Sequence, residues 1–352
     1  MVVEDSNLSG MDHIKHLFWR AGFGLSAEEW TERRNWSISQ AVNHLFEAAK
    51  KAKPPVAQSG ANTPEDTGQP GKEALLEKIK EERKLVALQG SDWLQRMADP
   101  AQSALLERVA LFWHGHFACQ TRFSLLATAQ LNTLRTHALG SFRELTVAMA
   151  RDVSMIRFLN NQQNRKDRPN ENFARELMEL FTIGRGNYTE KDVKEAARAF
   201  TGWSSNLRGE FLFRPGQHDY GVKTFMGQSG RFDGEDIIDR LLEKRATAEF
   251  ITRKVYRYFV SEQVDEGIVA GLSKRFYESD YQTETLLREI FESDWFYAPK
   301  NMGSKIKSPA DLLAGILRKL KIRFENELSL VFVQRALGQV LFNPPNVAGW
   351  PV

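Results

Sequence analysis

Cysteine is almost absent from this sequence, and its scarcity excludes two ways of stabilising a fold. Cys119 is the only cysteine, so no disulfide can form within the chain. A zinc site built from several cysteines is excluded for the same reason. Cys119 follows Phe117 and Ala118, and these neighbours favour a small buried side chain over a reactive thiol.

Long apolar runs are also lacking. No segment approaches the about 20 apolar residues that a transmembrane helix needs, so no membrane span is expected. The first ten residues, MVVEDSNLSG, contain neither the basic nor the apolar region of a signal peptide. As written, the sequence predicts a cytoplasmic protein, or a periplasmic or exported one if a leader has been removed.

Neither a basic stripe nor a familiar catalytic motif is present. The net charge is +3 without a dense lysine and arginine block, so no nucleic-acid partner is expected. The sequence has no Gly-rich phosphate loop after a strand, no G-x-S-x-G elbow and no H-E-x-x-H helix. The stretch RAGFG at residues 20–24 is too short for a dinucleotide fingerprint and is interpreted as a tight turn.

What the sequence does contain is helical periodicity over most of its length. Hydrophobic residues make up 42% of the 352 residues, which is enough for a sizeable core. We therefore expect a mainly α, multi-helix single domain over residues 1–352. Phe211 and Phe213 alternate with Leu212 and Arg214, which predicts a short β hairpin. Residues 53–71 carry four prolines and no aromatic residue, which predicts a flexible, disordered insertion.

Individual helices follow from apolar spacing and capping residues. Ser37 is expected to cap one helix, and Asp99 with Pro100 to start another that runs toward Trp113 and is interrupted at Gly115. The other expected helices cover residues 72–97, 123–137, 141–151, 236–243, 247–260, 267–277, 283–291, 309–320 and 328–341.

Residues 168–203, RPNENFARELMELFTIGRGNYTEKDVKEAARAFTGW, predict two amphipathic helices joined by a Gly-rich turn. Pro169 and Asn170 open the first helix, and Gly184 ends it in a left-handed conformation. Thr189 caps the second helix, with Asp192 in capping-box position. The expected core residues are Phe173, Leu177, Phe181, Phe200 and Trp203.

The carboxylates of this run allow two interpretations. Glu171, Arg175 and Glu179 are spaced by four residues, as in an ordinary solvated ladder of ion pairs. Alternatively, Glu171, Glu176 and Glu179 face an enclosed polar site, where they bind a metal or exchange protons.

Several segments together resemble one family. They are HLFWRAGFG (16–24), FWHGHF (112–117), the run 168–203, HDYGVKTFMGQSG (218–230), FITRKVYRYFV (250–260), KIKSPADLLAG (305–315) and LGQVLFNPPNVAGWP (337–351). In identity and order they resemble the bacterial family catalogued as domain of unknown function 1800. The resemblance implies a mostly helical fold without an established activity. It also implies frequent export and a partner from a sulfatase-like companion family. Since relatives continue beyond the position of Val352, we expect a truncated C-terminus.

Histidines provide the clearest candidates for chemistry. His114 and His116 flank Gly115, where a helix end could turn both rings toward one metal ion. The alternatives are acid–base chemistry, or capping of the helix end by hydrogen bonds to the backbone. His218 and Asp219 lie in an irregular segment and suit a site or a simple turn.

Two amide-rich segments add weaker candidates. Residues 160–168, NNQQNRKDR, could bind sugars or phosphates, or form turns. Asn343, Asn346 and Trp350 place amides beside an aromatic ring, as in carbohydrate sites, although a rigid loop that caps the core is the favoured explanation.

The leading hypothesis from the sequence is a hydrolase with a His/carboxylate pocket and a divalent metal. Its catalytic residues would be His114, His116, Glu171, Glu176, His218 and Asp219, and its metal ligands His114, His116, His218 and Glu179. The alternative is a non-enzymatic helical scaffold that binds a small molecule, a glycan or a partner protein.

Overall fold

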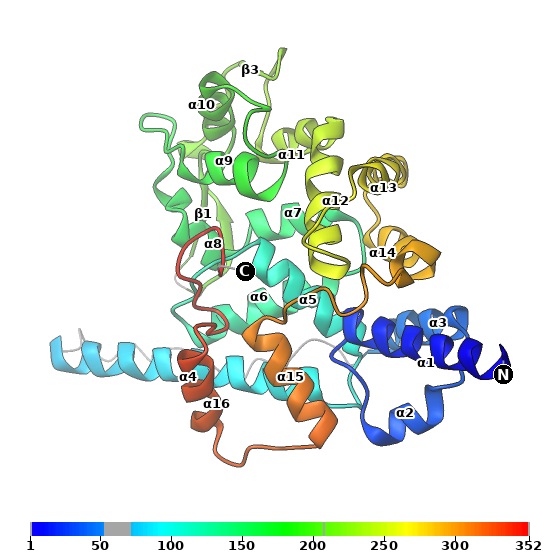
Figure 1. The fold of residues 1–352 in the computed structure, drawn as a ribbon. Coiled ribbons are helices and arrows are strands. Elements are labelled where there is room, and N and C mark those ends of the chain that lie inside the picture. The colour runs from blue at the N-terminus through cyan, green and yellow to red at the C-terminus, as the bar shows by residue number, and fades with distance from the viewer. Residues whose placement is uncertain (1, 53–71, 207, 351–352) are drawn as a thin grey trace.

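The computed structural model describes residues 2–52, 72–206 and 208–350. The insertion expected at residues 53–71 and the last two residues lie outside these ranges. Within them, helices dominate and the only sheets are two pairs of short strands, which confirms the mainly α architecture (Figure 1). None of the helices in the described ranges is long and apolar enough to cross a membrane.

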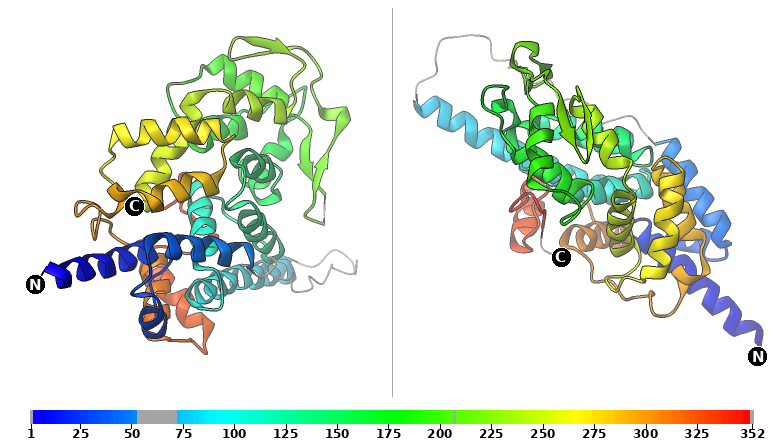
Figure 2. Two further views of the ribbon diagram at one scale, coloured as in Figure 1. Left: turned by 90° about the vertical axis from the view of Figure 1, so that its right-hand side faces the viewer. Right: turned by 90° about the horizontal axis from the view of Figure 1, so that it is seen from above.

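The first half of the chain contributes helices of very different length. They are α1 (Val2–Arg20), α2 (Ala27–Arg33), α3 (Ile38–Lys50), α4 (Lys72–Ala98), α5 (Ala104–His116), α6 (Ser124–His137), α7 (Phe142–Ala150), α8 (Val153–Phe158) and the short η1 (Asn161–Gln163). The start of α1 and the start of α4 project at opposite ends of the molecule (Figure 2).

The second half begins with the predicted helical hairpin. Its elements are α9 (Asn172–Glu176), η2 (Leu177–Phe181), α10 (Glu190–Ala199), β1 (Trp203–Ser205), β2 (Phe211–Phe213), η3 (Pro215–Gln217), β3 (Lys223–Phe225), β4 (Gln228–Gly230), α11 (Gly234–Leu242), α12 (Arg245–Phe259), α13 (Glu266–Glu278), α14 (Thr283–Glu292), η4 (Asp294–Tyr297), α15 (Pro309–Leu320) and α16 (Glu327–Ala336).

Helix α5 lies at the centre of the fold, because nearly all of its side chains are buried. It packs against α3, α4 and α6, while α15 and α16 both pack against α4. One hydrophobic cluster extends from Ile14 in α1 to Phe342 near the C-terminus. Segments distant in sequence therefore share one core, and Cys119 is buried within it.

The predicted start of α5 and its interruption were both wrong. Asp99 accepts a hydrogen bond from the N–H of Ala101 in a turn, and Ser103 caps the helix instead. The helix then continues through Gly115 to His116. A glycine inside a helix costs only about 1 kcal/mol, and burial of the neighbouring Trp113 outweighs that cost.

The hairpin of residues 168–203 has the predicted core, since Phe173, Leu177, Phe181, Phe200 and Trp203 are all at most 4% exposed. Thr189 and Asp192 form the expected capping box, and Gly184 adopts φ +79°. The first helix differs from the prediction because its last turn, η2, is a π-turn. A π-turn inserts an extra residue and rotates the following side chains relative to the α-helical pattern.

The irregular region after α10 contains two hairpins rather than one. In the predicted hairpin, β1 pairs antiparallel with β2 and Trp203 lies opposite Phe213. In the second hairpin, β3 pairs with β4 and Lys223 lies opposite Gly230. The last helix, α16, ends at Ala336 rather than at residue 341, and Gly338 follows with φ +81°.

Candidate functional site

His114 is fully buried and joins α5 to the C-terminal segment. Its Nε2 accepts a hydrogen bond from the backbone N–H of Phe342 at 3.1 Å. The ring also packs against Trp93, Phe342 and Trp350. Burial lowers the pKa of His114 to about 3, so the imidazole is neutral at pH 7. These contacts match the structural alternative for this residue.

His116 points to a different part of the molecule, since residues two apart do not share a helix face. Its Nε2 lies 3.0 Å from the carbonyl oxygen of Phe181, and its Nδ1 lies 3.2 Å from Nζ of Lys254. Lys254 also donates to the carbonyl of Leu180 at 2.8 Å. Together the two side chains cap carbonyls at the end of η2, where a helix leaves acceptors without partners.

The pKa of Lys254 should appear in the pH dependence of stability. Burial lowers this pKa to about 8, whereas an unfolded lysine titrates near about 10.4. Between these values the unfolded chain binds more protons, so stability should rise with pH, by about 1.4 kcal/mol per unit of pKa difference. We expect Lys254→Met to lose this rise.

The measurement is the free energy of unfolding at pH 7 and pH 10 for the parent and for Lys254→Met. Other groups titrate equally in both proteins, so the difference between them isolates Lys254. The exposed Lys194 provides the control, because Lys194→Met should follow the parent curve. Parallel curves for the parent and Lys254→Met would contradict the lowered pKa.

His218 and Asp219 fasten the region after β2 to the end of α10. Nδ1 of His218 lies 2.8 Å from the carbonyl oxygen of Thr201, and its ring lies between Phe213 and Tyr220. The carboxylate of Asp219 accepts from Nε of Arg198 at 2.7 Å, and this hydrogen bond lowers the pKa of the Asp219 carboxyl. Both side chains therefore have partners within their own region.

The carboxylates of the 168–203 run form only part of the predicted ladder. Arg175 pairs with Glu171 at 3.2 Å but also with Glu190 at 2.7 Å. Glu179 pairs instead with Arg185 and accepts from the hydroxyl of Tyr188 at 3.1 Å. The π-turn of η2 accounts for this change, because it displaces Glu179 from the face of Arg175.

Glu176 forms no ion pair among the described residues, although Arg175 and Arg185 lie near enough to act on its charge. Burial and the neighbouring Glu179 raise the pKa of its carboxyl. It remains only half-buried, on the same short stretch of chain as the other two glutamates.

The contacts of the described residues do not join these side chains into one site. No hydrogen bond or ion pair links His114, His116 or His218 to the three glutamates in the described chain. Over the same residues, no group of three or more His, Cys, Asp and Glu side chains could hold a metal ion. The structure thus gives the proposed ligand set His114, His116, His218 and Glu179 no geometric support.

The amide-rich stretch 160–168 has an inner and an outer half. Asn161 and Asn164 are buried, and their side-chain amides donate to backbone carbonyls of residues 197, 200 and 203. Asn160 adopts the left-handed region, with φ 59°. This conformation, which asparagine tolerates better than most residues, leaves the side chain of Asn160 exposed. The inner amides thus support the fold, and the outer side chains face a cavity.

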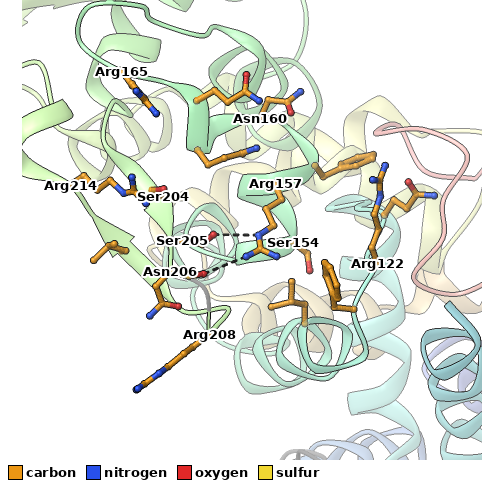
Figure 3. A pocket seen from close by; sticks show the side chains of 17 residues that line it. Arg122, Ser154, Arg157, Asn160, Arg165, Ser204, Ser205, Asn206, Arg208 and Arg214 are labelled. Atoms are coloured by element: carbon orange, nitrogen blue, oxygen red, sulfur yellow. Dashed lines mark hydrogen bonds between the residues drawn. The ribbon is translucent and has the colours of Figure 1, made fainter. Parts of the chain in front are cut away.

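That cavity, which we call the arginine pocket, has a volume of about 1200 Å³. Its walls come from the segment before α6, from α8 and η1, and from the β1–β2 hairpin. Five arginines line it: Arg122, Arg157, Arg165, Arg208 and Arg214. Figure 3 shows Arg165 and Arg214 on one side, Arg122 on the other and Arg157 between them. No Asp, Glu or His is found among its described lining residues.

Arg157 is the positioned cation of the arginine pocket. Its Nε donates to Oγ of Ser205 at 3.3 Å, and its guanidinium lies 5.8 Å from the ring centroid of Phe123. The other four arginines are exposed and form no ion pair within the described parts of the chain. A concave surface with one sign of charge focuses the potential and attracts anions.

The arginine pocket also contains polar groups that lack partners. Oγ of Ser154, a residue only 3% exposed, and Oε1 of Gln162 have no hydrogen-bond partner among the described residues. Both residues line the pocket, as do four further amide side chains, those of Gln120, Asn160, Gln163 and Asn206. Such groups cost free energy when they are buried and unpaired, and a ligand that pairs with them recovers it.

Sequence reasoning found only one wall of this pocket. The stretch 160–168 was identified for its amides, but the arginines at positions 122, 157, 208 and 214 share no spacing that a motif search could detect. Only the fold brings α8 beside β1 and so collects these side chains. The Asn343 loop was identified too. It contacts α5 through the N–H of Phe342, which donates to His114, and Oδ1 of Asn343 accepts from Gln120, which lines the pocket.

Comparison with known proteins gives one result. The family described as "Protein of unknown function (DUF1800)" matches residues 16–352, nearly the whole chain. No match was found among curated proteins or among solved structures. The predicted family is therefore confirmed, while the expected partner and cellular location stay predictions.

Proposed function

Because the chain belongs to the DUF1800 family, whose description assigns no activity, we propose a function from its own geometry: the arginine pocket binds an acidic oligosaccharide. The observation that carries the proposal is the lining itself, five arginines without a single described acidic residue. Arginine pairs with carboxylate, sulfate and phosphate groups through two parallel hydrogen bonds. Several such cations suit a ligand with several anionic groups.

The remaining lining residues favour a carbohydrate over a nucleic acid. Five amide side chains and three serines offer donors and acceptors for sugar hydroxyls. Phe123, which is 45% exposed, provides an aromatic surface beside them. Single-stranded nucleic acids are usually bound by successive aromatic platforms along a basic groove, and no basic stripe is evident in this sequence of net charge +3.

The size of the pocket also supports an extended ligand. Its volume of about 1200 Å³ lies above the roughly 300–1,000 Å³ typical of small-molecule sites. The hydrolase hypothesis has no comparable support, because the pocket offers no described carboxylate or imidazole for acid–base catalysis. We therefore propose the binding function that was the alternative at the sequence level.

The test compares four probes by calorimetry: a heparin-derived hexasaccharide, an oligouronate, neutral maltohexaose and a single-stranded oligonucleotide. We expect the two acidic saccharides to bind, and their affinity to fall with added salt. Replacing Arg122, Arg165 and Arg214 together by glutamine should weaken binding by about 100-fold to 1,000-fold, which corresponds to a net loss of about 1–1.4 kcal/mol for each arginine.

The control removes the same charge elsewhere. Arg34, Arg83 and Arg231 are exposed and do not line the pocket, so their replacement by glutamine should leave saccharide binding unchanged. Binding of the oligonucleotide alone, equal binding of maltohexaose, or equal losses in both triple variants would overturn the proposal.

A further inference from the structure

A second cavity, with a volume of about 420 Å³, lies between α1, α5, α15 and the segment 302–307. It shares no lining residue with the arginine pocket. Most of its wall comes from residues 16–24 and 305–315, two of the segments on which the family resemblance rests. We call it the α1–α15 cavity.

Cations outnumber carboxylates around this cavity. Arg108 pairs with Asp311, and Lys305 pairs with Glu262 at 2.7 Å. Arg20 is only 7% exposed and has no carboxylate partner in the described chain, since it donates to the carbonyl of Asn301 at 2.9 Å and to Oγ of Ser304. One buried guanidinium therefore has no ion pair in the described chain, and the carboxylate of Glu262 acts on it only at longer range.

Lys307 is a second cation that forms no ion pair with a carboxylate in the described ranges. Its Nζ lies 3.1 Å from the ring centroid of Trp19. The indole is held in place by two glycines: a Cβ added at Gly24 or at Gly315 would lie 2.9 or 2.8 Å from its ring atoms. The close approach of these backbones fixes the ring over which Lys307 sits, so the ammonium is placed at the cavity wall.

Three polar atoms in this wall have no hydrogen-bond partner in the described chain. They are Nε2 of His16, a residue 6% exposed, Nε of Arg108, a residue 4% exposed, and Oδ1 of Asp311, whose carboxylate is ion-paired with Arg108. Burying an unpaired polar group costs about 1–3 kcal/mol, so each is usually paired with protein, water or ligand. The imidazole of His16 is neutral at pH 7, since burial and the charge of Arg20 lower its pKa to about 4.

We infer that the α1–α15 cavity binds a small organic anion, through a carboxylate or phosphate group held by Arg20, Arg108 and Lys307. Such an anion supplies the negative charge that Arg20 and Lys307 lack and an acceptor for the free Nε of Arg108. Burial and the charges of Arg108, Lys319 and Arg20 lower the pKa of Lys307 to about 8, as expected where positive charge is not balanced. The volume suits a molecule much smaller than an oligosaccharide.

The experiment uses the full chain in a phosphate-free buffer and three probes: benzoate, benzamide and inorganic phosphate. Benzoate and benzamide have nearly the same shape and differ in charge. We expect benzoate and phosphate to bind by calorimetry and to raise the melting temperature with concentration, and benzamide to do neither. Whether benzoate or phosphate binds more tightly shows which anionic group the cavity prefers.

Variants locate the site. Lys307→Gln should weaken benzoate binding about 10-fold or more, and Lys307→Arg, which keeps the charge, should restore it. The exposed Lys194 on α10 gives the matched control, and Lys194→Gln should bind like the parent. The triple arginine variant of the arginine pocket should also bind benzoate normally, so failure of one proposal can be told from failure of the other.

Three results would overturn the inference: no binding of benzoate or phosphate, equal binding of benzamide, or an unchanged affinity in Lys307→Gln. Loss of benzoate binding in the triple arginine variant would place the anion in the other pocket and would overturn it too.

Discussion

Replacing Phe173 by alanine is expected to lower the free energy of unfolding by about 3–5 kcal/mol. Phe173 is 1% exposed, and its ring meets that of Phe200 edge-on, with centroids 4.9 Å apart. Phe200 in turn packs against Trp203 at 5.1 Å. Truncation removes the ring between α9 and α10 on which this aromatic stack rests.

The upper part of that range is expected because the surroundings cannot close around the lost ring. A Cβ added at Gly234 would lie 2.5 Å from Phe200 and 2.7 Å from Trp203, so α11 already confines both rings. The cost of a large-to-small change grows with the cavity that remains. Denaturant unfolding measures the effect, with the free energy of unfolding falling at the same slope against denaturant concentration in both proteins.

Phe332 provides the matched control for this substitution. It is 72% exposed on α16, so Phe332→Ala makes the same chemical change without emptying a core site. Its effect should stay within about 0.5 kcal/mol. If Phe173→Ala unfolds at the same denaturant concentration as Phe332→Ala, the buried face assigned to α9 is wrong.

The core of this hairpin was predictable because apolar spacing and capping are local properties. Phe173, Leu177 and Phe181 follow one helical face, and Thr189 with Asp192 forms a box within four residues. The π-turn of η2 was not predictable in this way. It depends on partners such as Lys254 and His116, which cap its carbonyls from α12 and α5.

For the candidate site, too, local sequence did not show which distant partners the side chains would contact. The histidines of the FWHGHF segment were recognised as unusual, but a spacing of two residues does not say whether a helix continues through Gly115. Because it does, His114 and His116 reach separate partners, Phe342 and Phe181. The hydrogen bond of His114 reaches a residue 228 positions away, and that of His116 reaches one 65 positions away. The segments that resemble the family therefore contact one another here and stabilise the fold.

The two cavities were the features least predictable from the sequence, because the partners of a charged side chain come from segments that are distant in the chain. Arg20 and Lys307 look like ordinary surface cations in the sequence. Only the packing of α1 against the segment before α15 shows that Arg20 is buried without a carboxylate. The arginine pocket likewise depends on hairpin β1–β2 folding beside α8.

The second large effect is expected at Glu29, where Glu29→Met should cost about 3–5 kcal/mol. Oε1 of Glu29 lies 2.6 Å from Arg318, and Oε2 lies 3.2 Å from the same guanidinium. The pair joins α2 to α15, and both side chains are at most 7% exposed. Glu29 also pairs with Arg33 at 3.0 Å and accepts from the N–H of Ser26.

The two partners should respond unequally, because their other contacts differ. Without Glu29, Arg318 keeps only a 3.4 Å contact to the carbonyl of Asp99 and remains a buried charge. Without Arg318, the carboxylate of Glu29 retains Arg33 and the Ser26 N–H, so Arg318→Met should cost less than Glu29→Met.

A double-mutant cycle measured by denaturant unfolding tests this asymmetry. In Glu29→Met with Arg318→Met, two apolar side chains replace the ion pair and the buried Arg318 charge is gone, while Arg33 keeps its 3.6 Å contact with Glu32. The double variant should therefore be more stable than Glu29→Met alone, with a coupling energy well above the about 0.5 kcal/mol expected of independent sites. Additive losses would show that Arg318 does not depend on Glu29. The cost of breaking this pair thus comes mainly from the buried guanidinium left behind, rather than from the attraction that is lost.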